Sequence, residues 1–190
     1  MSNILIFDTE TTGLPKRKSF DQYHDPKKLK YYDSSRVIEI GYIIYNENGE
    51  KIKENCFLIK PNNFKIENTH IHGISQIDAD LNGIEIKKGL EIFNNDLKNI
   101  KVLVAYNCLF DIHVLMSECY RNEYTELIKT LKTKKIECCM KLAQTKLSLL
   151  RYMKLKVLYE TLFKTQIIQQ HRALSDCEIC GKCYFKLINY

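Results

Sequence analysis

Apolar runs separated by polar turns divide the first part of the chain into three predicted strands. Asn3–Asp8 is a short apolar run that ends in a turn, and Val37–Tyr45 is a longer run rich in β-branched and aromatic residues. Asn48 and Gly49 predict a hairpin from this second strand into a third strand over Lys51–Lys60. The three segments together are typical of an antiparallel meander.

The rest of the chain combines helical periodicity with one continuous apolar strand. Lys101–Tyr106 has no polar alternation, which predicts a strand covered on both faces. The other predicted elements are a loop with a short helix over Asn68–Asp80, helices over Lys88–Asn99 and Phe110–Arg121, two or three helices between Tyr124 and Lys164 with a short strand near Lys135–Cys138, and a last helix over Ala173–Leu187. This order predicts an α/β fold, in which a mixed β-sheet is flanked by helices.

The chain length of 190 residues predicts a single domain over residues 1–190, because globular domains span roughly 100–200 residues. Hydrophobic residues make up 45% and charged residues 27% of the chain, a composition that excludes a disordered chain or a fibre. The sequence has neither an apolar run of membrane-spanning length nor a recognisable signal peptide. We therefore expect an intracellular, cytoplasmic protein without a membrane partner.

The net charge of +6 is concentrated in two segments. From Lys129 to Lys164 there are ten Lys and Arg residues against two acids, and Pro15–Arg36 has seven against three. Aromatic residues lie between the basic ones, a mixture that suits the phosphates and bases of single-stranded nucleic acid. The alternative is that both segments are solvated faces. Pro15–Arg36 is also long for a loop in so compact a chain, and long loops are often functional.

Eight cysteines in an intracellular chain are expected to be free thiols. Cys177, Cys180 and Cys183 have a spacing that also occurs in zinc sites, but all three fall within one helical pattern. We therefore expect thiols that are buried or half-buried there, and the same at Cys138 and Cys139. A structural zinc protein is the alternative.

Acidic residues lie close to the ends of the predicted strands. Asp8 and Glu10 are two residues apart, so a strand would direct both to one face. Asp111 begins a helix directly after a strand, and Asp176 shares a helical stripe with apolar residues that should face the core. Each acid also has an ordinary interpretation, as a surface strand end or as a helix N-terminal acid. His171, just before the last helix, is by itself more typical of a structural histidine.

The four carboxylates together are more informative than each alone, because the strand ends of an open α/β sheet are where sites form. Converging carboxylates repel one another unless cations neutralise them, and Mg²⁺ or Mn²⁺ prefers such oxygen ligands. Two divalent cations about 3.5–4 Å apart suit the cleavage of a phosphodiester. A neutral histidine nearby can accept the proton of the attacking water.

Three segments resemble the motifs of the DEDD 3′–5′ exonucleases. Asp8–Leu14 (DTETTGL) is similar to the first motif, Ala105–Asp111 (AYNCLFD) to the second, and His171–Asp176 (HRALSD) to the third in its histidine form, DEDDh. This subgroup includes the proofreading subunit of bacterial replicative polymerases, RNase T and oligoribonuclease. The resemblance spans nearly the whole chain and implies a ribonuclease H-like fold, in agreement with the order of the predicted elements.

The resemblance also implies roles for individual residues. Asp8, Glu10 and Asp176 would hold one of two divalent cations, Asp8 and Asp111 would serve the second, and His171 would be the general base. The residues implied in substrate binding are Thr11, Leu14, His72, Asn107 and Phe110. His72 belongs to the segment HGIS, which is similar to a family loop that orders the wall of the cleft. The second motif departs from the common family pattern at Tyr106 and Cys108, which leaves the metal ligands intact.

By this resemblance, we expect a metal-dependent 3′–5′ exonuclease that releases nucleoside 5′-monophosphates. We favour DNA with a single-stranded or frayed 3′ end, in proofreading or repair, because the first motif reads as in the proofreading members. The alternatives are a 3′–5′ exoribonuclease or oligoribonuclease, and a non-catalytic nucleic-acid-binding module associated with a polymerase. A DNA polymerase partner and a homodimer stay open. A further hypothesis is that the basic and aromatic residues of Pro15–Arg36 hold the strand beside the site.

Overall fold

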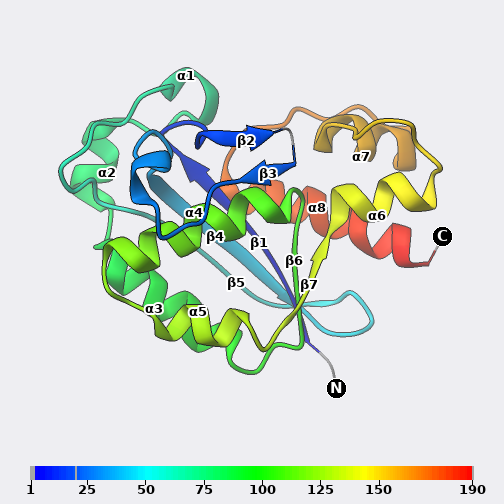
Figure 1. The fold of residues 1–190 in the computed structure, drawn as a ribbon. Helices are drawn as coiled ribbons and strands as arrows, with labels where there is room; N and C mark the ends of the chain where they lie inside the picture. The colour runs from blue at the N-terminus through cyan, green and yellow to red at the C-terminus, as the bar shows by residue number, and fades with distance from the viewer. Residues whose placement is uncertain (1–2, 20, 190) are drawn as a thin grey trace.

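The computed structural model describes residues 3–19 and 21–189. Its main sheet has five strands in the order β5-β4-β1-β6-β7 (Figure 1). These strands are β1 (Ile4–Thr11), β4 (Val37–Tyr45), β5 (Lys51–Leu58), β6 (Val102–Ala105) and β7 (Lys135–Cys138). β4 pairs antiparallel with β1 and β5, whereas β6 pairs parallel with β1 and β7. The predicted meander and the mixed sheet are therefore confirmed.

Helices cover both faces of this sheet (Figure 1). Over the described ranges they are α1 (Thr69–His72), α2 (Gln76–Asn82), α3 (Ile86–Leu97), α4 (Cys108–Arg121), α5 (Glu126–Leu131), α6 (Cys139–Lys146), α7 (Leu155–Phe163) and α8 (Ala173–Ile188). None of these described helices is long and apolar enough to cross a membrane.

Alternate residues of β1 point into two separate cores. Leu5 and Phe7 pack in the core formed with α3, α4 and α5, whereas Ile4 and Ile6 pack in the core formed with α6, α7 and α8. Because both faces of β1 are covered, its sequence has no polar alternation before Asp8. The face that carries Ile4 and Ile6 continues to Asp8 and Glu10, so the strand directs both acids toward the side of α8.

Two sequence predictions need correction. Strand β1 does not end at Asp8 but continues to Thr11, because Glu10 and Thr11 still pair with β4. Residues 15–36, described above as a loop, contain a small sheet of β2 (Arg17–Ser19) and β3 (Gln22–Tyr23) and a 3₁₀ helix, η1 (Leu29–Tyr31). Tyr32 helps to fold this segment, because its side chain is fully buried and donates a hydrogen bond to the carbonyl of His24 at 2.5 Å. This anchor gives the basic segment its own fold.

Gly41 lies where β4 passes the start of α8. A Cβ atom at this position would lie 2.6 Å from the backbone nitrogen of Leu174 and 2.7 Å from the carbonyl carbon of Ala173. We predict that Gly41→Ala lowers the free energy of unfolding by about 1–3 kcal/mol, because the backbone of α8 must move. Urea denaturation measures this change.

Gly181→Ala is the matched control for this prediction. A Cβ atom there would meet the hydroxyl of Tyr45 at 2.8 Å, which belongs to a side chain and not to the backbone. Alanine is also favoured over glycine in a helix by about 1 kcal/mol. The control should therefore be close to neutral, and an equal loss of stability in both variants would contradict the argument.

Candidate active site

Strand β1 and helix α8 bring three of the predicted acids together. Asp8 and Glu10 lie on the face of β1 that packs against α8, and Asp176 lies in the first turn of α8 on its buried side. Carboxylate oxygens of the three side chains lie within 4.8 Å of one another. Among the described residues, they form the only cluster of three or more potential metal ligands. We call Asp8, Glu10 and Asp176 the carboxylate cluster.

The fourth predicted acid, Asp111, lies beside this cluster in the first turn of α4. Its side chain is buried, and Oδ1 accepts hydrogen bonds from the backbone N–H of Thr9 at 3.1 Å and from the Thr9 hydroxyl at 2.8 Å. These bonds attach the start of α4 to β1. After burial, the charge of Asp111 has the largest effect on the pKa of Asp8, so the two carboxylates lie close together.

Burial and mutual repulsion raise the pKa values of these acids. Burial, followed by the charge of Asp111, raises the pKa of Asp8 well above its ordinary value. Burial, followed by the charge of Asp176, raises the pKa of Glu10 to about 8. Burial raises the pKa of Asp111 to about 7, although the hydrogen bonds from Thr9 oppose it. The site without a cation therefore retains protons near neutral pH.

The oxygen atoms of the cluster fit a hard divalent cation. Oδ2 of Asp176 accepts a hydrogen bond from Nε2 of Gln169 at 2.7 Å. Oδ1 of Asp176 is buried, and no described residue donates a hydrogen bond to it. A buried carboxylate oxygen without a partner is costly, whereas Mg²⁺ and Mn²⁺ prefer oxygen ligands of this kind. Asp8, Glu10 and Asp176 are therefore the residues suited to hold such a cation.

His171 lies in the segment just before α8, with an exposed side chain and a φ of 49°. Non-glycine residues rarely adopt this left-handed conformation, and those that do are concentrated at functional sites. Burial raises the pKa of Asp176, and the charge of His171 opposes this shift. The histidine is thus near the carboxylate cluster and open to solvent, whereas its role as a base stays a prediction.

The predicted substrate-binding residues lie around the ends of β1 and β6. The Thr11 hydroxyl donates to the carbonyl of Gly13 at 2.8 Å, and Leu14 leaves 65% of its surface exposed, which is high for an apolar side chain. Asn107 is the N-cap residue of α4, and Phe110 is half-buried in the first turn of that helix. Their contacts with a substrate stay predictions.

His72 differs from the other predicted substrate-binding residues, because its ring is buried and both ring nitrogens have partners. Nδ1 accepts the backbone N–H of Ile74 at 3.1 Å, which leaves Nε2 to donate to the carbonyl of Glu67 at 3.1 Å. His72 therefore orders its own loop. Its geometry favours an indirect effect on substrate binding.

Two charged residues beside the cluster were not predicted as site residues. Glu39 lies on β4 directly opposite Glu10 and is fully buried. Its carboxylate accepts hydrogen bonds from Nη2 of Arg172 at 2.5 Å, from Nε of Arg172 at 3.0 Å, and from the backbone N–H of Ala173 at 2.8 Å. An acid within the otherwise apolar β4 sequence is the signal that such a partner exists.

The mixed sheet flanked by helices is a fold of the ribonuclease H-like class. The chain belongs to the exonuclease family RNase_T, whose sequence pattern matches residues 5–184. A comparison with curated proteins found no match. The family membership confirms the resemblance drawn from the three motifs and supports a hydrolase that acts on nucleic acid.

Solved structures share this fold at low sequence identity. Exonuclease X in complex with 5′ overhanging duplex DNA is 21% identical, with a TM-score of 0.66 over 98% of this chain and 91% of that chain. Pop2p of S. pombe, in its Mg²⁺- and Mn²⁺-bound form, is 21% identical, with a TM-score of 0.72 over 96% of this chain and 81% of that chain. E. coli exonuclease I in complex with a dT13 oligonucleotide is 19% identical, with a TM-score of 0.73 over 100% of this chain but only 41% of that chain.

The raised pKa values predict how stability depends on pH when chelator removes all cations. An acid whose pKa is higher in the folded than in the unfolded state destabilises the fold once it is charged. The free energy of unfolding should therefore fall as the pH rises from about 4 through about 8. Asp8→Asn relieves the repulsion and should stabilise the protein near neutral pH by at least about 1 kcal/mol, since one pKa unit corresponds to about 1.4 kcal/mol.

Urea denaturation in EDTA across this pH range measures both effects. The gain from Asp8→Asn should vanish near pH 4, at about the ordinary pKa of an aspartate. Glu47→Gln removes an exposed acid that is distant from the site in sequence and should change little. A gain from Asp8→Asn that is independent of pH would show that charge repulsion is not its cause.

Proposed function

We propose that this chain is a metal-dependent 3′–5′ exonuclease that releases nucleoside 5′-monophosphates. The observation that carries the proposal is the carboxylate cluster with its unpartnered Asp176 oxygen, in a chain of the exonuclease family. Asp8, Glu10 and Asp176 would hold one divalent cation, and Asp8 with Asp111 would hold a second. Mg²⁺ or Mn²⁺, when bound, supplies positive charge that stabilises the developing charge of phosphodiester hydrolysis.

The side chains of the protein supply binding, orientation and proton transfer. His171, in its neutral form, would accept a proton from the attacking water at a ring nitrogen. Thr11 would contact the terminal nucleotide through its backbone, and Leu14 would pack against its base. Asn107 and Phe110 would flank the strand. The exposure of Leu14 and His171 supports these roles, because a substrate can reach both side chains.

We favour a single-stranded or frayed DNA 3′ end as the substrate, in proofreading or repair. Exonuclease X and exonuclease I are described in complexes with overhanging duplex DNA and with a dT13 oligonucleotide, which supports DNA over RNA. An exoribonuclease or oligoribonuclease is the alternative, and contacts to the 2′-hydroxyl would distinguish them. A DNA polymerase partner and a homodimer remain open predictions.

Matched 5′-labelled single strands of DNA and RNA test the reaction. We predict a ladder that shortens from the 3′ end in Mg²⁺, faster for DNA than for RNA. EDTA and the Asp8→Ala substitution should each abolish it, because EDTA removes the cations and the substitution removes a carboxylate that would hold them. A faster rate on RNA would instead favour the exoribonuclease.

A second variant separates catalysis from metal binding. His171→Ala should slow digestion by about 10²–10⁴-fold, the usual contribution of a general base. It should keep the thermal stabilisation by Mn²⁺ that we expect of the wild-type protein by linkage. Binding of the labelled strands without digestion in either metal would support the non-catalytic nucleic-acid-binding module.

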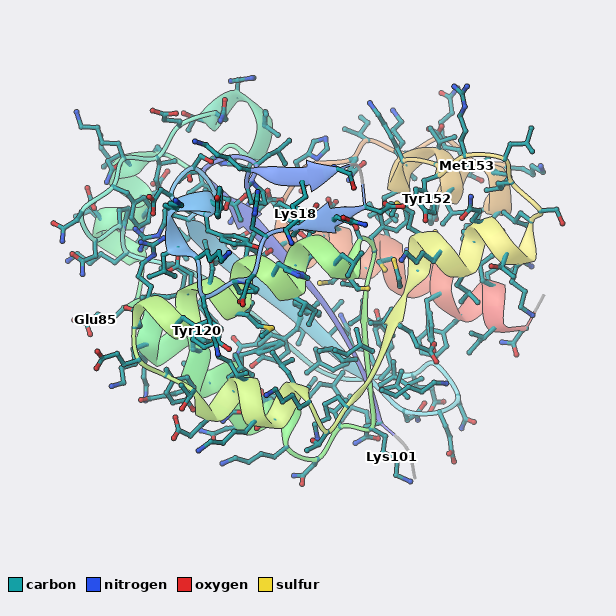
Figure 2. The ribbon with its side chains drawn as sticks, viewed as in Figure 1. Lys18, Glu85, Lys101, Tyr120, Tyr152 and Met153 are labelled. Atoms are coloured by element: carbon teal, nitrogen blue, oxygen red, sulfur yellow. The ribbon has the colours of Figure 1, made fainter. Side chains whose placement is uncertain are left out.

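We also propose that the segment 15–36 holds the strand beside the site. Tyr23 of β3 packs this segment against α4, because its ring lies 5.3 Å from the ring of His113 on that helix. Lys18, Lys28 and Lys30 are exposed on the same segment. Figure 2 shows Lys18 on the β2–β3 hairpin, at the opposite end of the molecule from Lys101.

The three lysines form a local concentration of positive charge. After desolvation, their charges are the main causes that lower the pKa of His24, so all three lie near its ring. The His24 ring stacks on Tyr31 at 3.6 Å, and Lys30 lies over the ring of Tyr31. Charge for phosphates beside a ring for bases is what a single strand needs.

Neutralising this patch with Lys18→Gln, Lys28→Gln and Lys30→Gln should raise the Michaelis constant for a long strand. The salt dependence of binding should become shallower by about 0.7 for each phosphate contact that is lost. The cleavage of a dinucleotide should not change. A triple variant of Lys87, Lys98 and Lys101, which are also exposed and lie outside both basic segments, is the matched control. Equal effects in the two triple variants would refute the role of the segment.

A further inference from the structure

The pair of Glu39 and Arg172 lies within electrostatic range of the carboxylate cluster. Glu39 is the nearest neighbour of Glu10 across the β1–β4 ladder, and its charge contributes to the raised pKa values of all three cluster acids. Arg172 acts in the opposite direction, since its charge lowers the pKa of Glu10 against the larger effect of burial. The charges of both Glu39 and Arg172 therefore act on the acids of the carboxylate cluster.

Glu39 holds the Arg172 guanidinium from one side. Both Nε and Nη2 of Arg172 bind its carboxylate, and such bidentate pairs fix direction as well as distance. Glu39 is fully buried, whereas 45% of the Arg172 side chain is exposed. The glutamate is thus the rigid member of the pair, and the arginine is the member that has room to move.

The same glutamate also fixes the first turn of α8. It accepts the backbone N–H of Ala173, and the carbonyl of Arg172 accepts the N–H of Asp176 at 2.9 Å. His171 precedes Arg172 directly in the chain. By fixing this turn, Glu39 therefore influences the position of Asp176, a cluster acid, and of His171, the predicted base.

An arginine released beside crowded carboxylates competes with a metal ion. A guanidinium stays charged at all relevant pH values and pairs readily with carboxylates. Glu10 and Asp176 are acids that repel each other, so a nearby cation of any kind is attracted to them. The charge of Arg172 already acts on Glu10, so without Glu39 the guanidinium can pair with the cluster.

We propose that Glu39 is a positioning residue that holds the Arg172 guanidinium away from Glu10 and Asp176 and so keeps the carboxylate cluster free for a divalent cation. This inference rests on the proposed metal-dependent function. It concerns the affinity for the cation, and through the first turn of α8 it also concerns the placement of His171.

The test measures Mn²⁺ affinity directly, from the electron paramagnetic resonance signal of free Mn²⁺, in the full chain. Glu39→Gln keeps the size of the side chain but weakens the hold on Arg172, and it should reduce Mn²⁺ affinity by about tenfold or more. Adding Arg172→Gln to this variant removes the competing cation and should restore the affinity to near the wild-type value. Urea denaturation establishes that each variant is folded.

Glu118→Gln is the matched control. Glu118 is also buried and also binds an arginine, Arg36, at 2.6 Å, but it is not among the main causes of the pKa shifts of the cluster. Its loss should lower stability without changing Mn²⁺ affinity. The catalytic constant of Glu39→Gln should fall at limiting Mn²⁺ and recover in excess Mn²⁺, with the Michaelis constant for DNA unchanged.

The outcomes separate this inference from the proposed function. The proposed metal-dependent function fails if the wild-type protein binds no Mn²⁺, or if Asp8→Asn binds as much Mn²⁺ as the wild-type protein does. If the wild-type protein binds Mn²⁺ and Glu39→Gln binds it equally well, only the inference about Glu39 fails. If the double variant binds Mn²⁺ as weakly as Glu39→Gln does, competition by Arg172 is refuted.

Discussion

The structure depends on holding four carboxylates at distances where they repel one another. Asp8 and Glu10 are placed by the two-residue period of β1, whose preceding residues are buried in cores on both faces. Asp111 and Asp176 come from the first turns of two different helices. The free energy that keeps these acids together comes from the apolar cores behind them, because the acids themselves oppose it. The fold therefore assembles the carboxylate cluster whether or not a cation is bound.

Polar contacts attach helices α4 and α8 to strands β1 and β4 beside the carboxylate cluster. Thr9 binds Asp111 from the backbone and from the side chain, which fixes α4 against β1. Glu39 and the absence of a side chain at Gly41 fix the start of α8 against β4. Every one of these contacts lies within two residues of a predicted metal ligand or of its strand partner. Stability and site geometry are thus determined by the same few interactions.

The segment 15–36 packs on α4, the helix whose first turn carries Asp111. Its hairpin packs on α4 through Tyr23, close to Asn107, and its exposed face carries lysines. Exonuclease I is more than twice as long as this chain, and the shared part covers 41% of exonuclease I.

The sequence by itself determined the strands of the main sheet, most of the helices and the exonuclease family, because periodicity and motif spacing are local properties of the chain. It also predicted the meeting of Asp8, Glu10 and Asp176, since the faces of β1 and α8 can be read from their apolar residues. Only the tertiary structure decided the partners across the sheet. Glu39 and Arg172 are 133 positions apart, and no local pattern relates a buried acid to an arginine at that separation. Their pairing follows from the packing of α8 on β4.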